Sequence, residues 1–112
     1  MIIALKVRKK LINKALAIIQ ARSSSKRLPK KVLENISGMP MVWHIVQRAK
    51  SCKYVSKVIV ATSTDSTDDQ LFEFCKKNEI EVFRGSLDNV LSRYITILEK
   101  NHSKYFVRIT GD

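Results

Sequence analysis

The sequence predicts an α/β fold, a mostly parallel sheet with helices on both faces, and two observations carry this prediction. Four short apolar runs have the length and the β-branched content of buried strands. Three amphipathic segments with helical periodicity lie between these runs along the chain. Strands and helices that alternate in this way form βαβ units, in which the strands are parallel to one another.

The predicted strands cover residues 16–21, 57–62, 81–83 and 105–109. In a doubly wound sheet the chain turns back past its first strand, so the fourth strand can lie beside the first. The fourth strand runs directly into Thr110, Gly111 and Asp112. A domain that ended here would leave an edge strand of its parallel sheet with unpaired backbone N–H and C=O groups, which is unfavourable. We therefore interpret the chain as truncated after the fourth strand.

The predicted helices cover residues 40–51, 66–78 and 88–101. Pro40 suits a first helical turn, where a backbone N–H is not needed. For the second helix we expect Ser66 or Thr67 as the cap, with acidic residues favouring the positive end of the helix dipole. For the third helix, Ser86 or Asp88 is an ordinary capping residue.

Positive charge is concentrated in the first third of the chain. The formal net charge is +11, from 21 Lys and Arg against 10 Asp and Glu. The first acid is Glu34, and ten of the cations precede it, in two groups at residues 6–14 and 22–31. A basic segment indicates an anionic partner, but nucleic acid and nucleotide phosphate are both anionic. Charge alone does not distinguish them.

The second basic group forms the loop after the first predicted strand, where open α/β sheets place ligands. The loop has no glycine, so it is not a phosphate loop that binds through backbone N–H groups. Its Arg22, Arg27 and Lys31 would instead neutralise phosphate with side-chain charge, aided by the hydroxyls of residues 23–25. A solvated basic surface loop is the alternative interpretation.

Further candidates follow the other predicted strands. Asp112 would lie across a crevice from the basic loop, where a carboxylate suits Mg²⁺ coordination; an ordinary Gly-Asp turn is the alternative. Thr62 and Ser63 are polar enough to line a pocket, or only to form a loop. Asp88 and Arg93 lie at the start of the third helix and are candidates for a pocket; the alternative for Arg93 is a simply solvated position on the helix surface.

Four ordered segments of this chain resemble the cytidylyltransferase family. They are Ala-Ile-Ile-Gln-Ala-Arg-Ser-Ser-Ser-Lys-Arg-Leu-Pro-Lys-Lys-Val-Leu at 17–33, Ile-Val-Ala-Thr-Ser-Thr at 59–64, Phe-Arg-Gly-Ser-Leu-Asp-Asn-Val-Leu-Ser-Arg-Tyr at 83–94 and Val-Arg-Ile-Thr-Gly-Asp at 107–112. The resemblance covers residues 15–112. The family includes the synthetases of CMP-activated acylneuraminate and 3-deoxy-manno-octulosonate, and the branch that this chain resembles most is the spore-coat polysaccharide branch.

The resemblance implies a Rossmann-like nucleotide-diphospho-sugar transferase fold and the reaction of CTP with an acidic sugar to give a CMP-sugar and pyrophosphate. It implies that Arg22, Arg27 and Lys31 hold the triphosphate, with Arg22 and Lys31 acting in catalysis. Ala21 and Arg22 would approach the cytosine through backbone atoms, and Asp112 would bind Mg²⁺. The residues expected to bind the nucleotide are Ala21, Arg22, Ser23, Arg27, Lys31, Thr62 and Ser63; Asp88 and Arg93 are pocket candidates.

This chain departs from the family pattern in several places. Lys30 stands where the family usually has glycine, and Ser23 and Lys26 stand where methionine and threonine are common. Relatives continue well past the Gly-Asp pair, so we expect residues 15–112 to be the N-terminal half of a nucleotidyltransferase domain, preceded by a basic extension at 1–14. The full-length protein would form a homodimer.

Three functional hypotheses follow. The first is CTP-dependent activation of an acidic sugar for surface polysaccharide synthesis, in the cytoplasm and without a membrane or nucleic-acid partner. The second is a nucleotide-binding remnant that does not catalyse. The third is a small basic nucleic-acid-binding domain; against it, aromatic residues are not interleaved with the cations as stacking would require.

Overall fold

The computed structural model describes residues 2–4, 14–23, 31–103 and 105–110. Its main element is a five-stranded sheet in the order β1-β7-β2-β5-β6. The strands are β1 Ile2–Ala4, β2 Ala15–Gln20, β5 Val55–Ser63, β6 Val82–Gly85 and β7 Phe106–Thr110. β2 is parallel to both β5 and β7, and β6 is parallel to β5, whereas β1 runs antiparallel to β7. The predicted mostly parallel α/β sheet is confirmed.

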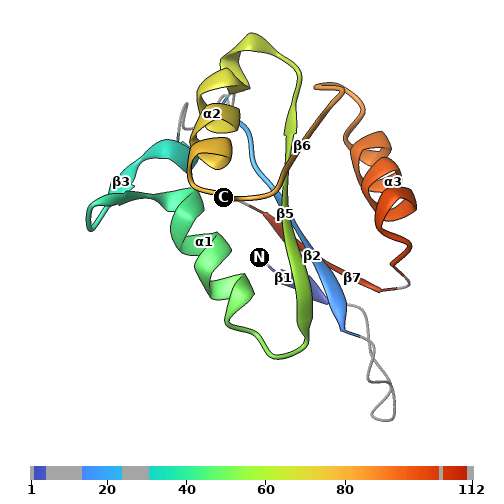
Figure 1. Cartoon of the computed structure of the whole chain (residues 1–112). Coiled ribbons are helices and arrows are strands. Elements are labelled where there is room, and N and C mark those ends of the chain that lie inside the picture. Colours follow the sequence, from blue (N-terminus) through green and yellow to red (C-terminus); the bar gives the residue numbers. More distant parts are fainter. Residues whose placement is uncertain (1, 5–13, 24–30, 104, 111–112) are drawn as a thin grey trace.

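Helices cover both faces of the sheet, as Figure 1 shows: α1 Met41–Lys50 and α2 Asp69–Lys77 lie on one side, and α3 Val90–Asn101 on the other. Alternate side chains of β2 divide between two cores because successive residues of a strand point to opposite faces. Ala17 and Ile19 pack in the core of α1 and α2, and Leu16 and Ile18 pack in the core of α3. All four are almost fully buried, which explains why this strand has no polar alternation in sequence.

The predicted return of the fourth strand to the first is also confirmed. β7 lies beside β2 in parallel register, with Gln20 opposite Thr110. The other neighbour of β2 is β5, so the chain leaves β2 in one direction and returns on its other side. This arrangement creates a topological switch point at the carboxyl ends of β2 and β7.

Several short elements were not predicted. β1 forms an edge strand within a segment that the sequence analysis treats only as a basic extension. The 3-10 helix η1 Lys31–Leu33 leads into a hairpin of β3 Asn35–Ile36 and β4 Met39–Pro40. Ser37 and Gly38 form its two-residue turn with φ of 51° and 92°, the left-handed conformation that such turns require.

The predicted capping residues of the second and third helices were wrong. Asp65, not Ser66 or Thr67, caps the 3-10 helix η2 Ser66–Asp68 that precedes α2, and its carboxylate accepts hydrogen bonds from the backbone N–H and hydroxyl of Thr67. These bonds lower the pKa of Asp65 below its ordinary value. Asn89 caps α3 by accepting from the backbone N–H of Ser92, in place of Ser86 or Asp88.

None of the helices in the described part of the chain has the length and hydropathy required to cross a bilayer.

Candidate functional site at the carboxyl edge of the sheet

The candidate residues of three strands meet at the carboxyl edge of the sheet. Ala21, Arg22 and Ser23 follow β2, Thr62 and Ser63 end β5, and Gly85 ends β6. The backbone N–H of Thr64 donates to the carbonyl of Gly85 at 2.9 Å, which continues the β5–β6 pairing beyond the ends of the strands. The strand register therefore places these three strand ends at one edge of the sheet.

Asp68 fixes the loop after β2 against the end of β5. Its carboxylate is fully buried, and one oxygen accepts a 2.5 Å hydrogen bond from the backbone N–H of Ser23. The other oxygen accepts from the hydroxyl of Ser63, and the Ser63 oxygen in turn accepts from the backbone N–H of Asp65 at 3.2 Å. From the sequence, the acidic residues here were expected only to favour the positive end of the second helix. The true role of Asp68 is to hold together two loops that are distant in sequence.

Arg22 and Lys31 keep their charges available. Arg22 is exposed, Lys31 is half-buried, and neither side chain makes a hydrogen bond or ion pair with another described residue. The backbone around them is fixed: the N–H of Ala21 donates to the carbonyl of Ala61 at 3.1 Å, and Val32 beside Lys31 is buried. Two unpaired cations on an anchored backbone can attract an anion without first breaking an ion pair.

The burial of Arg93 excludes the alternative in which this residue is simply solvated. Its side chain lies in the first turn of α3 and is 1% exposed, although it is the largest of the fully buried side chains. Nε, Nη1 and Nη2 all lack a hydrogen-bond partner among the residues that the structure describes. The amphipathic pattern was misleading here because Arg93 sits beside the buried Tyr94, on a part of the helix that the sheet covers.

Two further buried polar atoms at this edge have no hydrogen-bond partner among the described residues, the hydroxyl oxygens of Ser23 and Thr62. Buried polar groups in proteins are nearly always hydrogen-bonded, so each of these orphaned groups requires an explanation. Asp88 is exposed and makes no hydrogen bond or ion pair with another described residue, so the structure does not join it to this group. Arg27 and Asp112 lie outside the described residues.

Arg84 is a structural residue of this edge that the sequence analysis did not single out. Its Nε donates to the carbonyl of Ser63 at 2.7 Å, and its Nη2 donates to the carbonyl of Asp65 at 2.9 Å. Nη2 also pairs with the carboxylate of Asp69 at 2.8 Å. Arg84 thereby binds the loop after β5 to β6. No sequence signal distinguishes it from the other cations of the chain.

A second polar cluster lies between β2, β7 and α3. The side-chain oxygen of Gln20 accepts from the hydroxyl of Tyr94 at 2.8 Å and from Nη2 of Arg108 at 3.1 Å. Nε of Arg108 donates to the Tyr94 hydroxyl at 3.2 Å, which closes the triangle. The sequence signal that could have revealed this cluster is a glutamine at the last position of an otherwise apolar strand.

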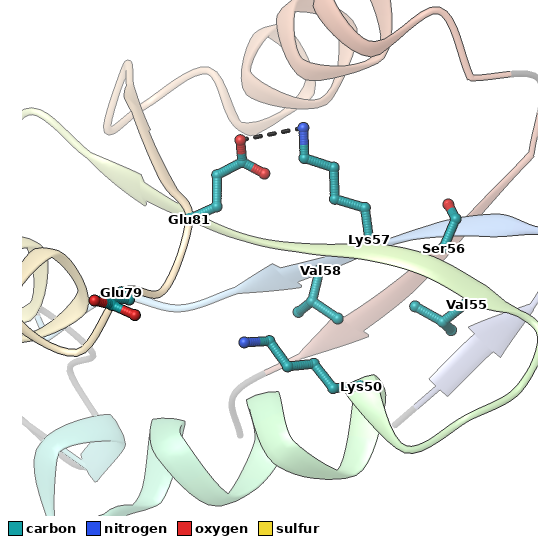
Figure 2. Close-up of a pocket in the computed structure, with 7 residues that line it drawn as sticks. All are labelled: Lys50, Val55, Ser56, Lys57, Val58, Glu79 and Glu81. Atoms are coloured by element: carbon teal, nitrogen blue, oxygen red, sulfur yellow. Dashed lines mark ion pairs between the residues drawn. The ribbon is translucent and has the colours of Figure 1, made fainter.

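A shallow pocket of about 360 Å³ lies at the opposite end of β5, lined by Lys50, Val55, Ser56, Lys57, Val58, Glu79 and Glu81. β6 does not extend this far, so the amino-terminal half of β5 has a free edge. In Figure 2, Lys57 and Glu81 face each other across this edge, while Val55, Val58 and Lys50 lie on the other side of β5. The pocket is open, has charges of both signs, and contains none of the candidate residues.

Among the described residues, no group of three His, Cys, Asp or Glu side chains could hold a metal ion. Both oxygens of the buried Asp68 are already hydrogen-bonded. The described residues alone therefore do not form a magnesium site, and the expected Mg²⁺ ligand Asp112 lies outside them.

The parallel sheet, the helices on both faces and the switch point define an α/β protein of the Rossmann-like class. The cytidylyltransferase family model matches residues 16–112, and the chain belongs to this family. The resemblance that the four sequence segments indicated is thus confirmed.

Individual relatives agree with this assignment. The chain is 37% identical over 105 residues to the spore coat polysaccharide biosynthesis protein SpsF of Bacillus subtilis, covering 90% of this chain and 44% of that protein. It is 30% identical over 101 residues to 3-deoxy-manno-octulosonate cytidylyltransferase of Escherichia coli, covering 90% of this chain and 40% of that enzyme. The chain therefore spans less than half the length of these relatives.

Solved structures show the same fold. A cytidylyltransferase from Leptospira borgpetersenii superposes with a TM-score of 0.81 at 34% identity, covering 89% of this chain and 42% of that one. CMP:2-keto-3-deoxy-manno-octonic acid synthetase, solved in complex with CTP, superposes with a TM-score of 0.75 at 27% identity, covering 89% of this chain and 41% of the synthetase.

Proposed function

We propose that this chain supplies the CTP-binding part of an enzyme that transfers CMP to an acidic sugar. The observation that carries the proposal is Arg22, an exposed cation directly after β2 at the switch point of a cytidylyltransferase fold, which pairs with no other described residue. The relative solved with CTP supports the nucleotide. The acidic sugar is supported by the resemblance to 3-deoxy-manno-octulosonate cytidylyltransferases.

In the proposed reaction a sugar hydroxyl attacks the α-phosphorus of CTP in line with the leaving group. A bond forms between the sugar oxygen and the α-phosphorus, the bond to the β-phosphate oxygen breaks, pyrophosphate leaves, and the hydroxyl proton passes to solvent. Such a reaction depends mainly on positioning and on neutralisation of the phosphate charge. Arg22 and Lys31 would supply that charge, and Arg27 would add to it.

The anchored backbone would position the base. The N–H of Ala21 is already bonded to Ala61, so the Ala21 carbonyl is the group left to approach the cytosine. Ser63 would serve mainly to hold Asp68 and hence the loop, because its hydroxyl is committed to that carboxylate. Ser23 and Thr62 retain unpartnered hydroxyls and would contact the nucleotide directly.

The proposal also includes Mg²⁺ bound through Asp112, which would offset phosphate charge, and a homodimer of the full-length protein in the cytoplasm. Surface polysaccharide synthesis is the proposed role because the relative from Bacillus subtilis is a spore coat polysaccharide biosynthesis protein. Asp88 remains a pocket candidate for the sugar side.

The alternative within the same family is a nucleotide-binding chain that does not catalyse. Binding and turnover separate the two: pyrophosphate release with CTP and an acidic sugar supports the enzyme, and CTP binding without release supports the alternative.

A fluorescence titration tests the proposal through Trp43, the one tryptophan of the chain. CTP, ATP and a single-stranded oligonucleotide are titrated with and without Mg²⁺. We expect CTP to bind most tightly, and more tightly still when Mg²⁺ is present. Tighter binding of the oligonucleotide than of CTP would reject the proposal in favour of a nucleic-acid-binding domain.

A further inference from the structure

The buried guanidinium of Arg93 is bound by no group of opposite charge in the described part of the chain. It is 1% exposed, and its three nitrogens make no hydrogen bond with another described residue. Burial is the main cause that lowers the pKa of Arg93, yet arginine remains protonated in proteins. A buried charge that is neither paired nor hydrogen-bonded is strongly unfavourable. Arg93 therefore destabilises the folded protein unless a bound anion pairs with its guanidinium.

The charged groups around Arg93 do not neutralise it. Asp68 is near enough to raise its pKa, as is Tyr94, while Arg22 lowers it. However, both oxygens of Asp68 are occupied, one by the backbone N–H of Ser23 and one by the hydroxyl of Ser63. Arg93 and Arg22 thus place two positive charges in one region, with a single carboxylate that is bonded elsewhere.

Gly85 makes room for the side chain of Arg93. A Cβ atom at position 85 would lie 2.6 Å from Cγ of Arg93 and 3.1 Å from the ring of Phe83, both closer than van der Waals contact allows. The backbone of Gly85 is not in the left-handed region, so its glycine serves this close approach and not a turn. Any larger residue would displace Arg93 from its buried position.

We propose that Arg93 binds a phosphate group of the nucleotide. This proposal rests on the proposed function, and it adds the buried Arg93 to the phosphate-binding cations Arg22 and Lys31. A phosphate fits better than a sugar carboxylate because it carries more charge to balance the two positive charges of Arg93 and Arg22. Because the guanidinium is covered, binding must include a local rearrangement that admits the anion.

Calorimetric titration of the 112-residue chain with tripolyphosphate tests this inference without involving base or sugar. We expect Arg93→Met, which keeps the volume and removes the charge, to weaken tripolyphosphate binding by about tenfold or more. Arg93→Lys should recover only part of the loss, because an ammonium lacks the planar fork. Arg48→Met, at an exposed position on α1, is the matched control and should bind as the unaltered chain does.

Gly85→Ala provides a second test in which every charge is retained. The new methyl group should displace Arg93 and weaken tripolyphosphate binding severalfold. In a protein that already carries Arg93→Met, Gly85→Ala should not weaken tripolyphosphate binding any further. Thermal unfolding adds a readout without ligand: Arg93→Met should melt at a higher temperature than the unaltered chain at low salt, and tripolyphosphate should stabilise it less.

Gluconate, titrated in parallel, serves as a sugar carboxylate without phosphate. Four results would overturn the inference: unchanged tripolyphosphate binding by Arg93→Met, additive effects of Arg93→Met and Gly85→Ala, no tripolyphosphate binding by the unaltered chain, or an Arg93→Met loss seen with gluconate alone, which would assign Arg93 to a carboxylate. The proposed function fails separately. If tripolyphosphate binding depends on Arg93 but CTP binds no better than ATP, the phosphate site stands and the cytidylyltransferase assignment of activity falls.

Discussion

The backbone N–H of Ser23 donates a 2.5 Å hydrogen bond to the buried carboxylate of Asp68, a residue 45 positions further along the chain. The other oxygen of this carboxylate accepts from the Ser63 hydroxyl. One side chain therefore connects the loop after β2 with the end of β5. The loop that carries Arg22 owes its position to this connection, and the first prediction follows from it.

Asp68→Ala should lower the free energy of unfolding by about 2–4 kcal/mol, because the Ser23 N–H and the Ser63 hydroxyl both become buried without a partner. Urea denaturation followed by circular dichroism measures the change. Glu73→Ala, at an exposed position on α2, is the control and should change stability by less than about 0.5 kcal/mol. Equal stability of the two variants would show that Asp68 does not anchor the loop.

Arg22→Ala should weaken CTP binding by about 1–3 kcal/mol, the scale of a charge-assisted contact. Arg22 is exposed and makes no contact that stabilises the described fold, so the melting temperature should hardly change. Calorimetric titration gives the dissociation constant, and Arg48→Ala tests whether removal of any exposed arginine has the same effect. An unchanged constant for Arg22→Ala would remove the loop from the proposed site.

Arg84→Met should lower the free energy of unfolding by about 1–3 kcal/mol, since the carbonyls of Ser63 and Asp65 lose a charged donor. The methionine keeps much of the contact with the ring of Phe72, which lies 5.1 Å from the guanidinium. The comparison is Lys57→Met, which breaks the ion pair with Glu81. Both partners of that pair are about half exposed, at 47% and 49%, so its loss should cost less than about 1 kcal/mol. A larger effect at Lys57 than at Arg84 would contradict this ranking.

The two cysteines should react very differently with a thiol reagent. Cys52 is exposed, whereas Cys75 is buried and burial raises its pKa from 9.0 to about 12. At a pH of about 8 one thiol per chain should react rapidly, and Cys52→Ser should abolish this phase. The second thiol should react only when the protein unfolds. Two rapid equivalents in the native protein would contradict the burial of Cys75.

The raised pKa of Cys75 also predicts a pH dependence of stability. Between pH 9.0 and about 12 the thiol ionises in the unfolded chain but not in the folded one. The unfolded state is therefore favoured as the pH rises through this range, and stability falls. Denaturation of the unaltered chain and of Cys75→Ala across the alkaline range should show a steeper loss for the unaltered chain. Parallel curves would contradict the prediction.

The sequence was sufficient for the strands and helices that have a strong pattern. The apolar runs ending near Gln20 and Ser63 are strands, and the stripe that includes Val42 and Val46 faces the core. The caps at Asp65 and Asn89 were missed because several neighbouring residues can serve equally well as caps. The edge strand Ile2–Ala4 was missed because its pairing partner is more than 100 residues away, and three residues have no periodicity of their own.

Some residues of the candidate site could likewise be predicted from the sequence, and others could not. Arg22, which is exposed, and Lys31, which is half-buried, could be named as candidates because their position after a buried strand is visible in sequence order. Asp68 and Arg93 could not be assigned correctly, since their roles depend on burial and on partners from other elements. Helical periodicity states which residues share a stripe, but not how far a neighbouring sheet extends over it.

The sequence by itself determined the class of this protein: short apolar strands alternating with amphipathic helices permit few folds other than a parallel sheet covered on both faces. It also determined that positive charge follows the first strand. Only the tertiary structure decided which polar groups are removed from water, because burial is a property of packed layers and not of any one segment. The unpaired guanidinium of Arg93, in the space that Gly85 leaves for it, belongs to that second kind of knowledge.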